Sequence, residues 1–235
     1  MSPPVPPELL TDDVSLLMVL IDTNPYFWSS IKQSFPFSKF LSDVLAFLNA
    51  TLLLNQLNQV VVIATGYNSC GYVFDSAGLV NARAESCLPE LEKFLKNDAS
   101  MSTEDTVNGV GHSLLSGSLS MALCYIQRIF RSGAGHPQPR ILCLHGSPDG
   151  PGQYVAVMNA IFSAQRSMVP IDSCVIGAQH SAFLQQASHI TGGVYLKPQL
   201  LEGLLQNLLT VYATDMHSRN FIQLPKPLGV DFRAS

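Results

Sequence analysis

The sequence predicts an α/β fold in which a mostly parallel central sheet carries helices on both faces. Continuous apolar runs of strand length, such as residues 15–22 and 59–65, are typical of strands buried on both faces. These runs alternate with segments whose apolar residues keep helical spacing, and such alternation favours parallel strands joined by crossover helices. The chain has 235 residues, of which 47% are hydrophobic and 13% charged, so it can bury a sizeable core.

The first half of the chain is expected to begin with a buried strand whose carboxyl end carries Asp22. The next segment is rich in aromatic residues, proline and serine, which is typical of a loop. In order, the expected elements are the strand at 15–22, the loop at 23–37, a helix at 39–54, a strand at 59–65 and a short strand at 71–74, antiparallel at an edge.

The second half of the chain continues the alternation of helices and strands. Helices are expected at 85–96, 115–130, 151–166, 181–190 and 201–212, and strands at 141–144, 169–176 and 193–196. The polar segment 97–111 is expected to be a flexible loop, and a proline-containing tail follows the last helix. We find no internal repeat and no domain boundary, so residues 1–235 are expected to form a single domain.

The charge pattern argues against several classes of partner. The net charge is −4, and the 13 lysines and arginines are scattered, so autonomous binding of nucleic acid is not expected. We find no signal sequence and no apolar run of membrane-spanning length, so no membrane segment is expected. Three of the five cysteines, Cys124, Cys143 and Cys174, lie in apolar runs and are expected to be buried thiols of a reducing compartment.

The first strand ends in Asp22-Thr23-Asn24-Pro25-Tyr26, at the edge of the sheet where α/β proteins bind ligands. Here the chain resembles the von Willebrand factor A family, in which a first strand runs into Asp-x-Ser-x-Ser and these oxygens help to hold a divalent ion. Asn24 stands at the first serine position and Tyr26 at the second, where a phenol is too long and rigid to replace serine. We therefore expect a degenerate ion site at Asp22, Asn24 and Tyr26, which holds no metal.

Two further loops would have to complete such an ion site. The segment 113–118 offers serine hydroxyls but no threonine, and Asp149 is displaced within a Gly/Pro turn. Hydrogen bonding of the Asp22 carboxylate to the backbone is therefore the expected role of this residue. The alternative is a metal-dependent ligand-binding domain that retains a metal-ion-dependent adhesion site, in which the Asn24 amide oxygen would act as a ligand.

Catalytic patterns are weak in this sequence. The glycine-rich turn 146–152 lacks the spacing of a phosphate-binding loop. Cys143 and His145 lie two residues apart near a strand end, and Ser118 stands in Ser-Gly-Ser-Leu-Ser, which is not a nucleophile elbow. Asp172 and His189 are not part of any recognisable catalytic pattern in the sequence. We therefore expect neither an enzyme nor a cofactor bound by this chain.

Two apolar segments are candidates for contact with a partner protein. The helix at 151–166 is apolar on nearly every side, so one face covers the sheet and the other is either buried by a neighbour or offered to a partner. The candidate partner-binding residues on it are Tyr154, Val157, Met158 and Ile161. The aromatic cluster 26–28 is suited to an interface anchor, or equally to a loop that tucks under its own side chains.

The resemblance becomes narrower in several segments with distinctive residues. They include Leu-Leu-Met-Val-Leu-Ile-Asp-Thr-Asn-Pro and Leu-Gln-Gln-Ala-Ser-His-Ile-Thr-Gly-Gly-Val-Tyr-Leu-Lys. In these segments the chain resembles the smaller von Willebrand factor A-like core subunits of transcription factor IIH, and the likeness spans nearly the whole chain. The segments that carry it are 16–25, 152–154, 158–165, 184–197 and 230–234.

This resemblance implies a nuclear, non-enzymatic scaffold within the core of factor IIH, with roles in transcription initiation by RNA polymerase II and in nucleotide excision repair of DNA. It implies binding to the larger von Willebrand A-like subunit through that protein's RING-like zinc region, and association with further core subunits that include helicases. Members of the family continue past the segment that matches 230–234 into a cysteine-rich zinc module. The present sequence has no such module, so no zinc site is carried over.

Overall fold

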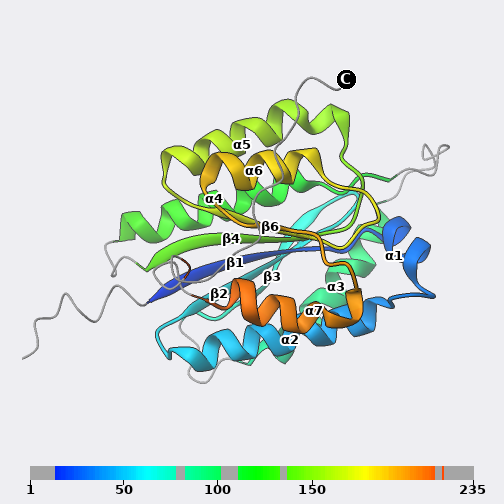
Figure 1. Ribbon diagram of the computed structural model, residues 1–235, viewed down its shortest axis with the longest axis horizontal. Coiled ribbons are helices and arrows are strands. Elements are labelled where there is room, and N and C mark those ends of the chain that lie inside the picture. The colour runs from blue at the N-terminus through cyan, green and yellow to red at the C-terminus, as the bar shows by residue number, and fades with distance from the viewer. Residues whose placement is uncertain (1–13, 78–82, 102–110, 133–136, 215–218, 220–235) are drawn as a thin grey trace, which may run out of the picture.

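The computed structural model describes residues 14–77, 83–101, 111–132, 137–214 and 219. In this part of the chain, six strands form one sheet in the order β3-β2-β1-β4-β5-β6 (Figure 1). The strands are β1 (Ser15–Asp22), β2 (Gln59–Thr65), β3 (Cys70–Asp75), β4 (Gln138–His145), β5 (Ile171–Val175) and β6 (Tyr195–Leu196).

Five of the six strands are parallel, and β3 pairs antiparallel with β2 at one edge. In the register of the central pairs, Asp22 lies opposite Thr65 of β2, and Ile21 lies opposite Leu144 of β4. The loops that follow β1, β2 and β4 therefore meet at one edge of the sheet. The predicted fold class, including the antiparallel edge strand, is confirmed.

Helices cover both faces of the sheet, as expected for buried parallel strands. Figure 1 shows one layer formed by α4, α5 and α6 and a second layer formed by α2, α3 and α7. The short helix α1 lies near the carboxyl ends of the central strands. The helices are α1 (Pro25–Ile31), α2 (Phe37–Leu54), α3 (Cys87–Ser100), α4 (Leu115–Ser132), α5 (Tyr154–Arg166), α6 (Ala182–Thr191) and α7 (Leu204–Asn207).

The core consists of two apolar clusters separated by the sheet. Alternate residues of β1 point to opposite faces, so that Leu17 and Val19 pack in the layer of α2, whereas Leu16 and Met18 pack in the layer of α4 and α5. Both sets are buried completely. This explains why β1 is apolar without interruption in the sequence.

The segment 23–37, predicted as a loop, contains α1, so that prediction was wrong. Asn24 caps this helix, because its side-chain Oδ1 accepts a hydrogen bond from the backbone N–H of Tyr26. Pro25 occupies the first turn, where its missing N–H costs nothing. Asparagine followed by proline is therefore a helix start here, although the composition of the segment favours a loop.

Other boundaries shift for local reasons. The helix expected at 85–96 runs as α3 to Ser100, so part of the predicted loop 97–111 is helical, and 102–110 lies outside the described residues. The helix expected at 201–212 is a 3-10 turn at Leu201–Gly203, the short α7 and a π-helical turn at Leu208–Tyr212. The segment 230–234 also lies outside the described residues.

Helix α2 is long and apolar enough, by length and composition, to be compared with a membrane span. The expectation that no apolar run reaches this length was therefore wrong. The apolar side chains of Phe40, Val44 and Phe47 are buried in the core beneath the sheet. Its buried Asp43 pairs with Lys39 one turn away, over 2.7 Å. These contacts are those of a core helix in a globular domain.

Candidate functional site

The candidate site is centred on Asp22, which is buried at the carboxyl end of β1. Its Oδ1 accepts a hydrogen bond from the backbone N–H of Asn24 over 3.0 Å. Its Oδ2 accepts from the backbone N–H groups of Gly146 at 3.0 Å and Ser147 at 2.7 Å, and His145 Nδ1 lies 3.3 Å from the same oxygen. The expected bonding of this carboxylate to the backbone is thus present.

Asn24 is completely buried and points its amide nitrogen toward the neighbouring loops. This nitrogen donates to the backbone carbonyl of Gly111 over 2.7 Å and lies 3.0 Å from Ser147 Oγ. Because a carbonyl oxygen can only accept, the Gly111 contact assigns the orientation of the amide. The amide oxygen is already used to cap α1. Asn24 therefore joins three loops and offers a donor where an ion would require an oxygen.

Tyr26 packs against a second tyrosine and supplies no ligand to Asp22. Its ring meets that of Tyr67 edge to face, with centroids 5.2 Å apart. Both rings lie against Gly111, where an added Cβ would come within 2.5 Å of the Tyr26 ring and 2.9 Å of the Tyr67 ring. The two tyrosines and this glycine form a packed cover over the loops that Asn24 connects.

The rest of the aromatic cluster 26–28 is tucked into the protein. Phe27 and Trp28 are buried, and Trp28 Nε1 donates to the backbone carbonyl of Asp22 over 2.7 Å. The Phe27 ring covers Gly146 so closely that a Cβ at that glycine would lie 2.0 Å from a ring carbon. Phe27 and Trp28 therefore pack inside the domain, as expected for a loop that tucks under its own side chains, and they are not placed as interface anchors.

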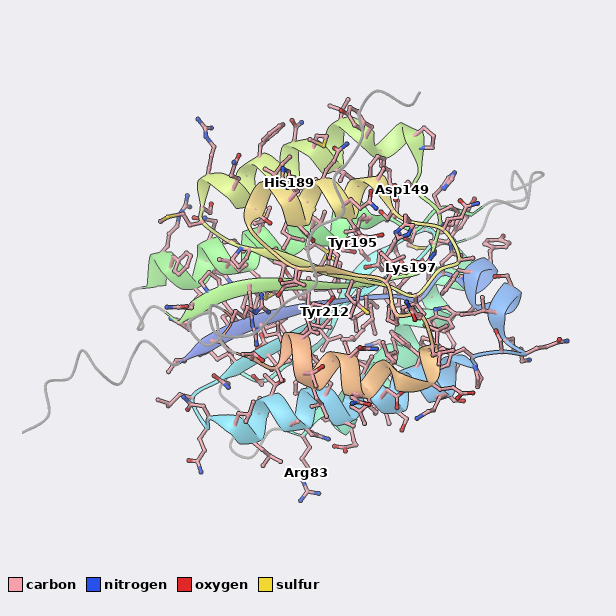
Figure 2. The ribbon with its side chains drawn as sticks, viewed as in Figure 1. Arg83, Asp149, His189, Tyr195, Lys197 and Tyr212 are labelled. Carbon is pink, nitrogen blue, oxygen red and sulfur yellow. The ribbon has the colours of Figure 1, made fainter. Side chains whose placement is uncertain are left out.

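Of the three remaining candidate ligands, Ser118 and Asp149 are used elsewhere in the fold. Ser118 Oγ lies 2.7 Å from Thr65 Oγ1, while Ser113 Oγ is buried without a hydrogen-bond partner. Asp149 accepts from Ser181 Oγ over 2.6 Å and from the backbone N–H of Phe183 over 3.1 Å. Figure 2 shows Asp149 at the amino end of α6, with His189 toward the other end of this helix. Asp149 therefore caps α6.

These residues do not fit a divalent ion. Both oxygens of Asp22 accept backbone hydrogen bonds, the Asn24 nitrogen faces the loops, and the Tyr26 ring packs on its neighbour. Within the described ranges, no group of three or more histidine, cysteine, aspartate and glutamate side chains is placed to hold a metal. A hard cation needs several convergent oxygens with free lone pairs, and this arrangement leaves too few of them.

The residues of the weak catalytic patterns have environments that do not suit catalysis. Cys143 is completely buried, and this burial raises the pKa of its thiol well above the usual range, so the reactive thiolate is disfavoured. The backbone N–H groups of Gly146 and Ser147 point at Asp22, so the glycine-rich turn does not present them to a phosphate. Cys124, expected to be buried, is exposed on α4, whereas Cys143 and Cys174 are buried as predicted.

The expected partner surface on α5 is only partly exposed. Val157 and Ile161 are completely buried against the sheet, so their assignment as partner-binding residues was wrong. Met158 is half-buried, and Tyr154 is 50% exposed. Sequence reasoning missed the apolar side chains that do reach the surface of this helix, which are Val155 at 68% exposure and Phe162 at 48%. The sequence held a signal for this exposure. Residues on one buried face of a helix are spaced three or four positions apart, as Val157 and Ile161 are. Val155 and Phe162 do not stand three or four positions from either of these two residues.

Comparison with known proteins assigns the chain to a family. A family model described as transcription factor Tfb4 matches residues 14–235. The chain belongs to the Tfb4 family. The resemblance to subunits of factor IIH, which the sequence segments indicated, is thereby confirmed, because relatives of this chain are named as factor IIH subunit TFB4.

Two relatives with factor IIH names illustrate the range of sequence identity. General transcription and DNA repair factor IIH subunit TFB4 of Arabidopsis thaliana is 63% identical over 246 residues, which cover 99% of this chain and 81% of that protein. General transcription factor IIH subunit 3 of Dictyostelium discoideum is 39% identical over 219 residues, which cover 85% of this chain and 59% of that protein. The chain thus spans part of the length of each relative.

Solved structures support the von Willebrand A-like fold of this chain. The crystal structure of the TFIIH p34 N-terminal domain matches with a TM-score of 0.74 and 29% identity, covering 85% of this chain and 99% of that one. The von Willebrand A domain of SpRpn10 matches with a TM-score of 0.57 and 18% identity, covering 86% and 98%. The second likeness concerns the fold alone.

Proposed function

We propose that this chain is a non-enzymatic scaffold subunit of transcription factor IIH, acting in the nucleus in RNA polymerase II transcription initiation and in nucleotide excision repair. Membership of the Tfb4 family supports the factor IIH role. The observation that carries the scaffold role is the set of hydrogen bonds by which Asp22 and Asn24 tie the loops after β1 and β4 to each other and to Gly111. Because these polar groups bond to one another, they stabilise the fold of the domain. The proposed role needs no cofactor held by this chain.

The proposed partner is the larger von Willebrand A-like subunit of factor IIH, through its RING-like zinc region, with further core subunits, including helicases, in the same assembly. The exposed face of α5 is a suitable surface for this contact. Tyr154, Val155 and Phe162 reach solvent there, with Met158 half-buried between them. A helix of this composition, without a single charged residue before Arg166, is typical of the apolar centre of an interface. We name these four residues the α5 surface.

The test is binding of the purified chain to the recombinant larger subunit, measured by calorimetry. Tyr154→Glu and Phe162→Glu should each weaken binding by about tenfold or more, since a charge at an apolar interface is left desolvated. Leu88→Glu on α3, in the opposite helix layer, is the matched control and should bind normally. Normal binding by both α5 variants would reject the α5 surface, and no binding by the unmodified chain would reject the proposed partner.

The competing function is a metal-dependent adhesion domain. It predicts that Mg²⁺ or Mn²⁺ raises the melting temperature of the chain by linkage, and that Asp22→Ala removes this increase. The geometry around Asp22 favours the opposite result. We expect the same melting temperature with millimolar Mg²⁺ and with a chelator, and an increase of several degrees would support the adhesion function.

A further inference from the structure

Met168 has an unusual backbone and an unusual exposure. It follows α5, in the turn that leads to β5, and its φ is +52°, in the left-handed region. It is the one residue other than glycine with a positive φ among the described residues. Its side chain is 88% exposed. A large apolar side chain is therefore held in a conformation that favours glycine, and it contributes little buried area to this chain.

A left-handed turn also ends α6, and there it carries the residue that this conformation favours. After α5, the backbone N–H of Met168 donates to the carbonyl of Gln165 and that of Val169 to the carbonyl of Ala164. This is the hydrogen-bond pattern of a Schellman motif, in which the left-handed position is usually glycine. At the end of α6 that position is Gly192, with a φ of +74°. Within one protein, the two turns differ in whether the left-handed position carries a side chain.

The charged side chains that the described helices α4 and α5 place near Met168 are arginines. Arg166, in the last turn of α5, is exposed. On the neighbouring helix α4, Gln127 Nε2 donates to Ser167 Oγ over 3.0 Å, and Arg131 lies one turn further along the same side of α4, also exposed. None of α4, α5 and α6 contains an aspartate or glutamate. Basic residues in last turns also complement helix dipoles, but that effect does not account for the exposed methionine.

We propose that Met168, together with Arg166 at the end of α5 and Arg131 on the neighbouring helix α4, is a docking point for a protein partner that presents carboxylates around an apolar pocket. The exposed methionine would enter the pocket, and the two arginines would pair with the carboxylates. The backbone strain at Met168 is then retained because the side chain acts outside this chain. This inference rests on the proposed function, since the partner is sought among the other subunits of factor IIH. The docking point lies beyond the carboxyl end of α5 and is distinct from the α5 surface.

A protein partner fits these features better than a nucleic acid. Two arginines neutralise few phosphates, and the chain as a whole carries a net charge of −4. The side chain of Met168 is uncharged and cannot neutralise a phosphate, whereas a flexible thioether is common at protein interfaces. Charge complementarity therefore favours an acidic protein surface.

The first experiment measures the melting temperature of the free chain. Met168→Gly should raise it by about 2 °C, because glycine removes the left-handed strain at a site where the side chain is mostly exposed. Met168→Ala keeps the strain and should leave the melting temperature within about 1 °C of that of the unmodified chain. A clear decrease in the glycine variant would show that the side chain stabilises its own chain, and would overturn the inference.

The second experiment measures the affinity of the same variants for the remaining recombinant core subunits of factor IIH, purified as a complex without this chain. Met168→Gly and Met168→Ala should both bind about tenfold more weakly. The double variant Arg131→Ala, Arg166→Ala should also bind more weakly, and its loss of affinity relative to the unmodified chain should become smaller at high salt. Met101→Ala, which removes an exposed methionine after α3, and Arg128→Ala, which removes a cation held over the Tyr125 ring, are the matched controls.

The outcomes separate this inference from the proposed function. If the unmodified chain does not join the core subunits, the proposed function fails. If it joins and the variants at Met168, Arg131 and Arg166 bind equally well, only the docking point is rejected. A short duplex DNA serves as the other probe: binding that depends on the arginines but not on Met168 would assign this surface to nucleic acid and overturn the protein partner.

Discussion

The backbone N–H of Ser147 donates to Oδ2 of Asp22 over 2.7 Å, and so joins two residues that are 125 positions apart in the sequence. Asp22 ends β1, and Ser147 lies in the loop after the neighbouring parallel strand β4. In an ion-binding relative of this fold, the corresponding carboxylate would help to hold a cation. In this protein it holds the backbone of the adjacent loop.

Loss of the Asp22 carboxylate should therefore destabilise the fold. We expect Asp22→Asn to lower the free energy of unfolding by about 2–3 kcal/mol, because the amide nitrogen cannot accept the bonds that a carboxylate oxygen accepts from two backbone groups. Urea denaturation measures the change. Glu202→Gln, at an exposed position, is the control and should change stability by less than about 0.5 kcal/mol. Equal stability of the two variants would mean that the Asp22 bonds are not important for folding.

Gly146 and Phe27 should show a strong energetic coupling. Gly146→Ala places a methyl group within the Phe27 ring and should cost about 1–3 kcal/mol of stability. Phe27→Leu removes part of the ring, so the double variant should be more stable than the sum of the single effects predicts. A double-mutant cycle by denaturation measures this coupling. Additive effects would contradict close packing of these two residues.

The amino end of α6 should depend on Asp149 and Ser181. Each side chain accepts a backbone N–H in the first turn of this helix, and Asp149 also accepts from Ser181 Oγ. Asp149→Ala and Ser181→Ala should each destabilise the chain by about 1 kcal/mol and speed amide exchange at Phe183 and Leu184. Unchanged exchange in the Asp149 variant would remove its assignment as a cap.

The buried pair of Arg219 and Asp172 should be sensitive to the loss of either partner. The guanidinium donates to both carboxylate oxygens, over 2.8 and 2.6 Å, and Asp172 Oδ1 also accepts from the backbone N–H of Val194. Arg219→Met leaves a buried carboxylate unpaired and should cost about 3–5 kcal/mol of stability. Combining it with Asp172→Asn should recover part of the loss. A double variant no more stable than Arg219→Met would contradict this account.

The buried thiols should make stability depend on alkaline pH. Burial raises the pKa of Cys174 to about 12, although a hydrogen bond with Tyr212 lowers it in part. The unfolded thiol loses its proton near its usual pKa of about 8.5, so the contribution of Cys174 to stability is complete below that pH and is lost progressively up to about pH 12. Cys174→Ala should reduce the fall in unfolding free energy over this range. An identical pH profile would show that other groups cause the fall.

Thiol labelling of the folded chain checks the burial behind that prediction. Cys124 is exposed and should react readily at neutral pH, whereas Cys143 and Cys174 should react only at the rate of unfolding. Rapid labelling of Cys143 in the folded protein would contradict its place in the core.

Much of the fold follows from short-range patterns in the sequence. The bounds of β1 and β2 agree with the predicted strands, and the ends of α4 and α5 lie within a few residues of the predicted helices. Local patterns succeed there because apolar runs and helical periodicity depend on neighbouring residues alone. Prediction failed at α1, where the capping bond of Asn24 and the position of Pro25 outweigh a loop-like composition.

The sequence by itself determined the fold class, the family and the absence of serine from the two positions where an ion site needs it. Only the tertiary structure decided that Asp149 caps α6, that Val157 and Ile161 face the sheet, and that Met168 stands exposed in a left-handed turn. The physical reason is the range of the interactions. Periodicity identifies an apolar helix, but which of its faces is buried depends on the register of strands and the packing of helices far apart in the chain.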